Sequence, residues 1–209
     1  MTVVAVFEPL EQELSQQGFF SVCGVDEAGR GPLAGPVYAA AVILKPNSVF
    51  EGLDDSKKLS EKKREILFDR IINEALAYKI VAVDHKTIDE VNILNATMLA
   101  MKTAIEGLPA AADYALIDGN RIPELDVPAQ YVIGGDAKVK SIAAASILAK
   151  VSRDRYMLEL AEKYPQYCFE KHKGYGTRLH YEMLDKHGIS PVHRMSFLKK
   201  YVEGRQNGR

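Results

Sequence analysis

The chain has 209 residues, of which 47% are hydrophobic, and its formal net charge is −1. This length and composition fit one domain with a sizeable core, and the near-zero charge excludes a protein that binds nucleic acid through overall basicity. No apolar stretch approaches the roughly 20 residues that a membrane helix needs. The first residues also lack the basic leader of a signal peptide, so we expect a cytoplasmic protein with no membrane partner.

Apolar runs predict five strands, which we expect at residues 19–25, 37–44, 78–83, 114–117 and 130–133. Helical periodicity predicts five helices, at about residues 61–76, 87–105, 141–164, 177–186 and 196–203. Ser60 is the expected cap of the first helix and Thr87 that of the second. Three strands come early and strands then alternate with helices, a pattern typical of a mixed α/β sheet flanked by helices.

This pattern divides the chain into three parts. We expect an N-terminal extension at residues 1–18, a core at residues 19–165, and a small C-terminal helical lobe, continuous with the core, at residues 166–209. Pro165 ends the strongest predicted helix and marks the second boundary. No internal repeat or coiled-coil seam is present in the sequence, so we expect a monomer.

The two cysteines, Cys23 and Cys168, lie far apart in the sequence and match no metal-ligand spacing. Nothing in their arrangement requires an oxidising compartment. Cys23 lies in an apolar run that we predict to be a strand. We therefore expect it to be a buried small hydrophobic residue.

Two adjacent carboxylates, Asp26 and Glu27, follow the first apolar strand, and Gly29 and Gly31 come soon after them. Adjacent strand residues point to opposite faces of a sheet, so both carboxylates reach one ligand only if the strand ends there. The two glycines indicate that it does. The simplest shared ligand is a hard divalent cation. The alternative is an ordinary strand exit with two solvated acids, which the Gly-Arg-Gly-Pro segment disfavours.

Asp118 and Asp136 repeat this pattern at the ends of two later strands. Asp118 precedes a glycine, and Asp136 follows two glycines. A single Asp-Gly pair usually marks a turn, and that interpretation would suffice for Asp118 alone. Four acids at three strand ends favour a metal site, because open α/β sheets gather functional groups at strand ends. Such a set supports hydrolysis of a phosphodiester with two divalent cations.

Basic residues cluster in three groups, within residues 57–64, 138–155 and 171–178. Basic groups around acidic metal ligands are typical of a protein that binds phosphates locally rather than indiscriminately. In the first group we expect phosphate contacts at the segment Ser56, Lys57 and Lys58. Solvated helix surfaces explain the rest of that group.

Two glycine-rich segments are further candidates for substrate contact. Gly29, Arg30 and Gly31 can bring backbone groups close to a ribose 2′-OH, the group that separates RNA from DNA. Tyr175 lies between two glycines, an unusual place for a core aromatic residue. Its ring either packs on its own loop or is presented to a ligand, where it could stack on a sugar or base, and the residues alone leave both interpretations open.

Other residues of a catalytic type fit less well. The five histidines show no paired metal-ligand spacing, and His172 is the only one that we place near substrate. Arg153 and Arg155 are possible phosphate contacts, although Arg153 and Asp154 could equally belong to a helix surface. We do not count Asp154 among the metal ligands.

The segments that carry these residues resemble the motifs of bacterial type 2 ribonuclease H, the ribonuclease HII family. The motifs follow one another in the order of that family and span nearly the whole chain. They lie at residues 26–37, 55–59, 118–120, 135–136, 141–150 and 173–177. Several separated motifs in one order are far more specific than any single glycine-rich loop.

The resemblance implies a ribonuclease H-like fold and an endonuclease that acts on RNA–DNA hybrids and on DNA duplexes containing ribonucleotides. Such an enzyme cuts 5′ of a single ribonucleotide by two-metal-ion catalysis and leaves a 3′-hydroxyl and a 5′-phosphate, as ribonucleotide removal in DNA replication and repair requires. Asp26, Glu27, Asp118 and Asp136 match the family's four catalytic acids, which hold Mg²⁺ or Mn²⁺. Tyr175 matches the residue that senses the junction between a ribonucleotide and the following deoxynucleotide.

Two alternatives remain open from the sequence. One is a ribonuclease HIII-type enzyme, which has a similar core but usually carries an N-terminal extension of domain size, whereas eighteen residues precede the first predicted strand here. The other is a metal-dependent nucleic-acid binding module that no longer cuts. The complete set of four acids argues against the second alternative.

Overall fold

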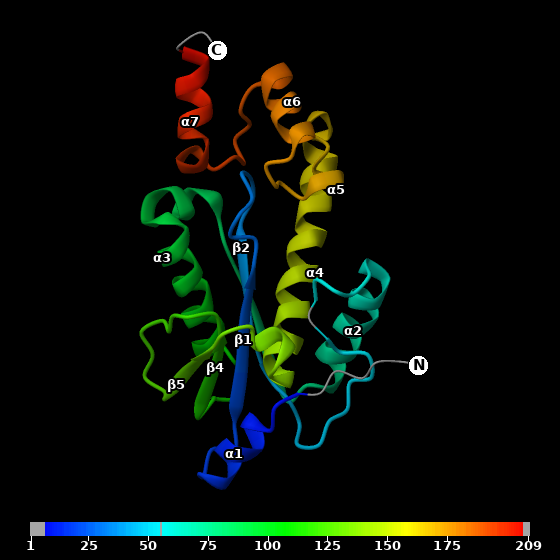
Figure 1. Cartoon of the computed structure of the whole chain (residues 1–209), viewed down its shortest axis with the longest axis vertical. Helices are drawn as coiled ribbons and strands as arrows, with labels where there is room; N and C mark the ends of the chain where they lie inside the picture. The colour runs from blue at the N-terminus through cyan, green and yellow to red at the C-terminus, as the bar shows by residue number, and fades with distance from the viewer. Residues whose placement is uncertain (1–6, 55, 207–209) are drawn as a thin grey trace.

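A computed structural model describes residues 7–54 and 56–206 of the chain. The start of the chain, which we examined for a signal peptide, lies outside the described residues, as does Asp55 in the loop before Ser56. The molecule is elongated, with a sheet at its centre and the C-terminal helices at one end (Figure 1). In the described part of the chain, no helix is long and apolar enough to cross a membrane.

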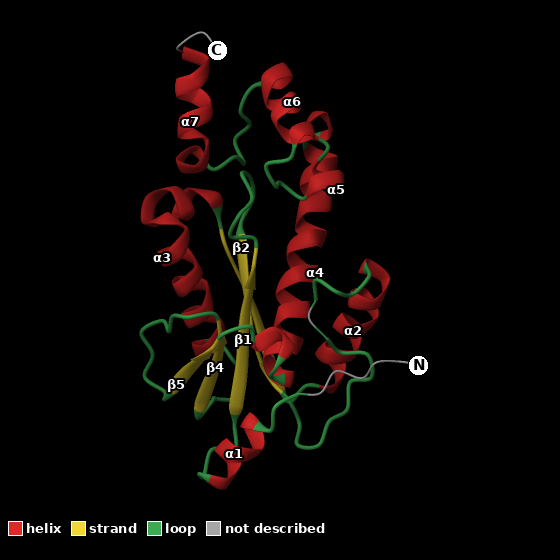
Figure 2. Cartoon of the chain, in the orientation of Figure 1, coloured by secondary structure: helices red, strands yellow, loops and turns green. Residues whose placement is uncertain are grey.

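The sheet has the five predicted strands, which are β1 (Val22–Ala28), β2 (Val37–Ile43), β3 (Ala77–Val83), β4 (Tyr114–Asp118) and β5 (Ala129–Val132). Their order across the sheet is β3-β2-β1-β4-β5. Strand β2 runs antiparallel to both of its neighbours, while β1, β4 and β5 run parallel to one another. The predicted mixed five-stranded sheet is therefore confirmed (Figure 2).

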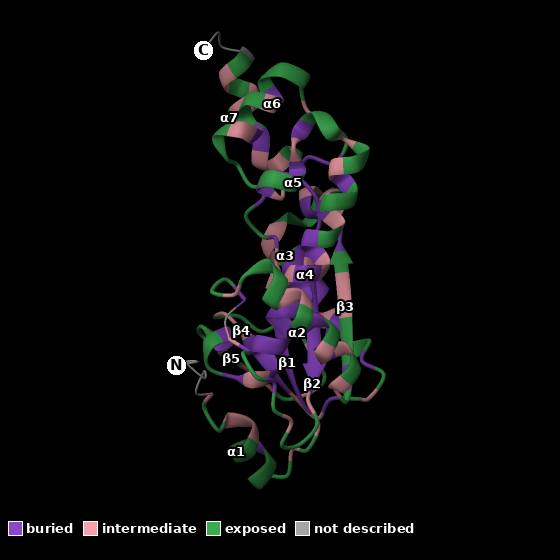
Figure 3. Ribbon diagram, turned by 90° about the vertical axis from the view of Figure 1, so that its right-hand side faces the viewer, coloured by how far each residue is buried: buried purple, intermediate pink, exposed green. Residues whose placement is uncertain are grey.

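Helices cover both faces of this sheet (Figure 1). Helix α3 (His85–Glu106) packs on one face, and α4 (Lys140–Lys163) packs on the other with α2 (Glu61–Glu74) beside it. The central strands β1 and β2 are buried on both faces, as strands between two helical layers must be (Figure 3). Cys23 is buried in β1 as expected, and this burial raises the pKa of its thiol to about 12.

The C-terminal helices α6 (Arg178–His187) and α7 (Met195–Gln206) form a lobe beyond one end of the sheet, with a separate apolar cluster that also includes the last turns of α4. The boundary that we set at residue 165 stays a prediction. Four short elements were not predicted, namely α1 (Leu10–Gln16), η1 (Gly135–Ala137), η2 (Pro165–Tyr167) and α5 (Phe169–His172).

Two details of the predicted elements were wrong. Strand β1 does not end before its acids, because Asp26 and Glu27 are both paired with residues of β2 and the strand continues to Ala28. The cap of α3 is Asp84 rather than Thr87, since the Asp84 carboxylate accepts the N–H of Thr87 at 2.8 Å. The predicted cap of α2 is confirmed, as Ser60 accepts the N–H of Lys63.

One glycine brings α4 close to the sheet. A Cβ atom added to Gly24 in β1 would lie 2.2 Å from the carbonyl carbon of Ser141 and 2.3 Å from the N atom of Ile142. Both are backbone atoms in the first turn of α4, so neither can move unless the helix moves. The absence of a side chain at residue 24 therefore sets the distance between β1 and α4.

We predict that Gly24→Ala lowers the free energy of unfolding by about 3 kcal/mol, because the added methyl group forces α4 away from β1. Urea denaturation of the purified variant measures this loss. The matched control is Gly204→Ala in α7, where an added Cβ meets nothing within 4 Å. That control should gain about 0.5–1 kcal/mol from helix propensity. Unchanged stability of Gly24→Ala would contradict the packing argument.

Candidate active site

The four predicted acids lie on neighbouring elements at one end of the sheet. Asp26 and Glu27 belong to β1, Asp118 is the last residue of β4, and Asp136 lies in η1, which follows β5. The parallel pairing of β1 with β4 places Asp26 beside Asp118 on adjacent strands. The structure thus brings together side chains that are up to 110 residues apart in the sequence.

Asp26 is the most enclosed of the four, with only 5% of its surface exposed. Burial raises the pKa of its carboxyl group well above the usual range, and the negative charges of Glu27 and Asp118 raise it further. Its Oδ1 atom accepts the N–H of Glu27 at 2.7 Å, and the Ser146 hydroxyl also favours the charged form. These contacts explain how a strand can hold this acid in its buried interior.

The other acids are held by partners of opposite charge or by the backbone. Burial raises the pKa of Glu27, and the Arg30 guanidinium, with Nη1 3.5 Å from Oε1, opposes that shift. Burial also raises the pKa of Asp118, whose Oδ1 accepts the N–H of Gly135 at 2.6 Å. Asp136 is buried, and its Oδ2 lies 3.3 Å from Nζ of Lys57.

This donor set fits a hard divalent cation. All four side chains offer carboxylate oxygens, the ligands that Mg²⁺ and Mn²⁺ prefer, and a cation relieves the repulsion among their charges. Within the described ranges, no group of three or more acidic, histidine or cysteine side chains is placed so that it could hold a metal ion by itself. An open arrangement suits Mg²⁺, because protein carboxylates supply only one or two of its ligands and waters or substrate phosphates supply the rest.

The Gly-Arg-Gly segment begins the connection between β1 and β2, residues 29–36, which we call the β1–β2 loop. Arg30 and Gly31 are exposed in this loop. The ring of Tyr175 lies beside them and is 44% exposed, and a Cβ atom on Gly31 would lie 3.6 Å from its Cε1. Of the two interpretations of this tyrosine, the structure favours presentation at the surface, and its role toward substrate stays a prediction.

The segment after Asp55 divides into a buried and an exposed part. Ser56 is buried, with its hydroxyl 2.7 Å from that of Ser146 on α4. Lys57 and Lys58 extend outward, with 79% and 58% of their side chains exposed. Lys57 therefore brings a positive charge to the acids. Substrate contact by Ser56 stays a prediction, and its hydroxyl already has a partner inside the protein.

Two other expectations about substrate contacts need correction, and a third stays a prediction. Arg153 is buried and binds main-chain carbonyls, so it does not contact phosphates from a helix surface. Arg155 forms an ion pair with Glu65 of α2, and phosphate contact by this arginine stays a prediction. His172 does not face substrate, because it is buried with its Nε2 2.9 Å from the carbonyl oxygen of Tyr167.

A row of hydrogen-bonded buried histidines, which the sequence alone does not indicate, supports Tyr175. Because Nδ1 of His193 accepts the N–H of Ser190 at 3.0 Å, its Nε2 carries the proton and donates to Nε2 of His180 at 2.9 Å. Nδ1 of His180 then donates to the carbonyl oxygen of Tyr175 at 2.9 Å. Burial lowers the pKa of both histidines to about 4, so both imidazole rings are neutral at neutral pH. The spacing of these histidines in the sequence matches no metal-ligand motif, so it gave no signal.

Arg194 was also missed. It is fully buried at the start of α7 and donates hydrogen bonds to carbonyl oxygens of the β1–β2 loop. A single arginine outside any basic group gives no signal in the sequence, because arginine is usually exposed.

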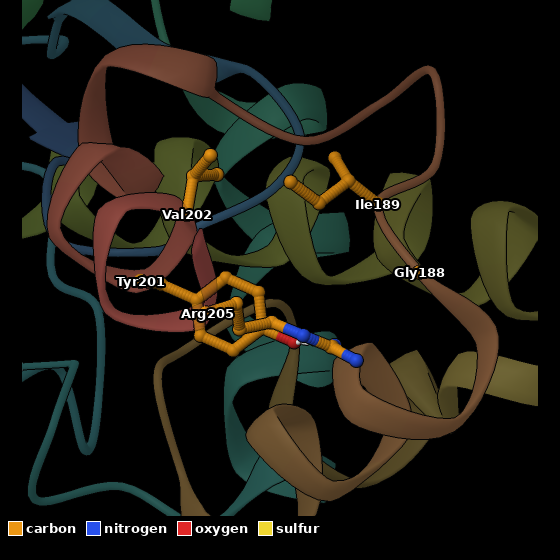
Figure 4. Close-up of a pocket in the computed structure, with 5 residues that line it drawn as sticks. All are labelled: Gly188, Ile189, Tyr201, Val202 and Arg205. Atoms are coloured by element: carbon orange, nitrogen blue, oxygen red, sulfur yellow. Dashed lines mark hydrogen bonds between the residues drawn. The ribbon is translucent and has the colours of Figure 1, made fainter. Parts of the chain in front are cut away.

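A hollow of about 290 Å³ lies elsewhere, in the C-terminal lobe. It is lined by residues from the segment that follows α6 and from α7, namely Gly188, Ile189, Tyr201, Val202 and Arg205 (Figure 4). Nη1 of Arg205 donates to the Tyr201 hydroxyl at 2.7 Å beside it. The hollow contains none of the four acids, so it is separate from the candidate active site.

Comparisons with known proteins identify the family of the chain. A family model described as Ribonuclease HII matches residues 23–200. The ribonuclease HII of Caldicellulosiruptor bescii is 58% identical over 193 residues, which are 92% of this chain and 94% of the relative. That of Idiomarina loihiensis is 60% identical over 176 residues, which are 84% of this chain and 94% of the relative.

The solved structures agree as well. The crystal structure of the ribonuclease H2 from Pyrococcus horikoshii OT3 is similar with a TM-score of 0.76 and 27% sequence identity, over 91% of this chain and 100% of that one. The fold is therefore the predicted ribonuclease H-like fold. The matched family model and the curated relatives set aside the ribonuclease HIII alternative and the non-cutting alternative. The chain belongs to the ribonuclease HII family.

Proposed function

We propose that this ribonuclease cuts 5′ of single ribonucleotides embedded in duplex DNA as well as within RNA–DNA hybrids, and leaves a 3′-hydroxyl and a 5′-phosphate. Membership of the ribonuclease HII family establishes the ribonuclease activity and implies hybrid substrates. The observation that carries the finer proposal is the exposed ring of Tyr175 beside Gly31, close to the end of the strand that holds Asp26 and Glu27. The chain would thereby remove ribonucleotides during DNA replication and repair.

Asp26, Glu27, Asp118 and Asp136 hold two Mg²⁺ or Mn²⁺ ions in this proposal. Bound there, the ions supply an activated water and stabilise the leaving oxygen. Backbone N–H groups of the protein hold two of these carboxylates in position to bind the ions. The N–H of Gly135 fixes the orientation of the Asp118 carboxylate, and the neighbouring Asp26 carboxylate is fixed by the N–H of Glu27.

Substrate contact is assigned to Gly29, Arg30, Gly31, Ser56, Lys57, Lys58 and Tyr175. The exposed basic side chains among these bind phosphates, and their charge also offsets the repulsion that the acids exert on a polyanionic strand. The backbone of the Gly-Arg-Gly segment contacts the ribose 2′-OH, which DNA lacks. Tyr175 stacks at the junction with the following deoxynucleotide. We further propose that the protein acts as a cytoplasmic monomer.

The direct test is incubation of a DNA duplex containing one ribonucleotide with the protein and Mg²⁺, followed by mapping of the cut on a sequencing gel. A single cut 5′ of the ribonucleotide, with 3′-hydroxyl and 5′-phosphate ends, supports the proposal. Cleavage of an RNA–DNA hybrid without cleavage of this duplex would contradict it.

We predict that Asp118→Asn reduces turnover at least a hundredfold and leaves the fold intact. The change removes one negative charge from the cation site, while the amide oxygen can still accept the N–H of Gly135. Single-turnover kinetics measure the loss, and circular dichroism checks the fold. Activity within tenfold of wild type, a barrier change of only about 1.4 kcal/mol, would show that Asp118 is not a ligand.

We predict that Tyr175→Ala reduces cleavage of a single-ribonucleotide duplex much more than cleavage of an RNA–DNA hybrid. A stacking contact is worth roughly 1–3 kcal/mol, which is about a 5- to 150-fold change in rate or affinity. Tyr175→Phe is the matched control, because it keeps the ring and deletes only the hydroxyl. Equal loss on both substrates, in proportion to a lowered melting temperature, would mean that the ring is merely structural.

The raised pKa values of the acids predict a pH-dependent stability in EDTA. A carboxyl group whose pKa is raised on folding favours the folded state at low pH, and this contribution is lost as the pH rises through the folded-state pKa. Asp26→Asn should therefore melt at a higher temperature than wild type at pH 8, with a smaller difference at pH 5. Added Mg²⁺ should raise the melting temperature of wild type more at pH 8 than at pH 5.

The control for this pH series is Asp126→Asn, which removes an acid that is exposed to solvent. Its melting temperature should follow that of wild type at both pH values. A gain for Asp26→Asn that is the same at pH 5 and pH 8 would exclude repulsion among the ionised acids as its cause.

A further inference from the structure

Arg194 lies at the start of α7 and reaches 165 residues back in the sequence to the segment that carries the catalytic acids. Its guanidinium is fully buried, and each of its nitrogens donates to a different carbonyl oxygen. Nη2 donates to Gly29 at 2.7 Å, Nη1 to Arg30 at 2.9 Å, and Nε to Gly35 at 2.9 Å. The planar fork thus binds both ends of the β1–β2 loop from beneath.

These hydrogen bonds also determine where the amides of the loop point. In a trans peptide unit, the C=O of one residue and the N–H of the next point in opposite directions. Because the carbonyls of Gly29 and Arg30 turn inward to Arg194, the N–H groups of Arg30 and Gly31 turn outward. Both residues are exposed, and within the described residues neither N–H donates to a protein acceptor. Two adjacent donors therefore face the surface beside Tyr175.

The charge beneath the loop strengthens these donors. Among the described residues, no carboxylate lies within ion-pair distance of Arg194 or Arg153. Arg153 holds two more carbonyls of the loop, through Nε to Pro36 at 3.2 Å and Nη2 to Ala34 at 3.4 Å. Asp89 acts on Arg194 and Asp154 acts on Arg153 only from beyond ion-pair distance. The two guanidinium charges therefore leave a positive potential at the loop, which favours an acceptor oxygen in front of the free amides.

We propose that Arg194 is a positioning residue for ribonucleotide recognition. It fixes the N–H groups of Arg30 and Gly31 so that they donate to oxygens of the ribonucleotide, at its 2′-hydroxyl and the adjoining phosphate. This inference rests on the proposed function, in which the Gly-Arg-Gly segment reads the ribose. Arg194 itself does not touch the substrate.

Arginine is required for this role because a lysine cannot replace its geometry. One ammonium group at the end of a flexible chain cannot reach three carbonyls that diverge from a planar fork. Arg194→Lys therefore keeps the charge and releases at least one peptide unit of the Gly-Arg-Gly segment. The amide of that unit can then rotate away from the substrate, and the contribution of that unit to ribose selectivity is lost.

The test compares binding in the Asp118→Asn background, so that the substrate stays uncut. The dissociation constant is measured in Mg²⁺ for a DNA duplex with one ribonucleotide and for the same duplex without it. Arg194→Lys should reduce the ratio of these two constants about tenfold, equivalent to roughly 1.4 kcal/mol, and leave binding of the all-DNA duplex unchanged. An undiminished ratio, or an equal weakening of both duplexes, overturns the positioning role.

The matched control is Leu198→Ala, which truncates a fully buried side chain of the same helix, in the apolar cluster that also contains Leu33 and Ala34 of the loop, and removes none of the hydrogen bonds from Arg194 to the loop. It should lower the melting temperature of the lobe and leave the ratio intact, so that a loss of stability alone is separated from a loss of selectivity. Equal constants for the two duplexes in Asp118→Asn itself would overturn the proposed function instead, because the protein would then show no preference for a ribonucleotide.

A second measurement keeps Arg194 in place, so it does not depend on the folding of the Arg194 variant. Amide hydrogen exchange by NMR should show fast exchange at Arg30 and Gly31 in the free protein. In Asp118→Asn bound to the ribonucleotide duplex, both amides should become protected, and they should stay less protected with the all-DNA duplex. Slow exchange of these amides in the free protein, or no gain in protection with the ribonucleotide, overturns the proposal.

Discussion

Repulsion among four carboxylates at one end of the sheet is the constraint on which the rest of the site depends. Burial raises the pKa values of Asp26, Glu27 and Asp118, so their ionisation near neutral pH destabilises the fold. Hydrogen-bond donors and positively charged side chains nearby stabilise the ionised acids, and one of these is Lys57, beside Asp136. The same repulsion favours the binding of divalent cations. Because the ionised acids are unfavourable without metal, the site is well suited to bind metal ions. The bound ions can in turn bind phosphate oxygens.

The position of the acids depends in turn on close packing beneath them. The small residue Gly24 lets the first turn of α4 approach β1, and the side chain of Glu11 in α1 accepts the N–H of Ser141 at the start of that helix at 2.9 Å. Ser146, further along α4, contacts both Asp26 and Ser56. Helix α4 thus joins the acid-bearing strand to the loop that carries Lys57. A change in the spacing between α4 and the sheet would move both parts of the site together.

Much of this arrangement could be predicted from the sequence, because apolar runs show where strands lie and acids at their ends show where groups converge. The end of β1 could not, since a buried carboxylate in a strand is unfavourable unless specific donors stabilise it, and those donors are tertiary contacts. The short helices α1 and α5 were missed because helices of this length form through tertiary packing rather than intrinsic propensity. Tyr175 was found from its flanking glycines, whereas Arg194 carried no local signal.

The two buried arginines, Arg153 and Arg194, orient the β1–β2 loop, although the sequence does not indicate this role. A loop that must expose N–H groups to a substrate has to turn its carbonyls inward, where no water satisfies them. Apolar side chains beneath the loop would leave those carbonyls unpaired, and a buried acid would repel them. A guanidinium satisfies several carbonyls at once, and without an ion-pair partner its charge also acts toward the substrate. Burial lowers the pKa of Arg194 to about 9, yet the group stays charged at neutral pH. The orientation of the β1–β2 loop therefore follows from an electrostatic contact made by a helix at the other end of the chain.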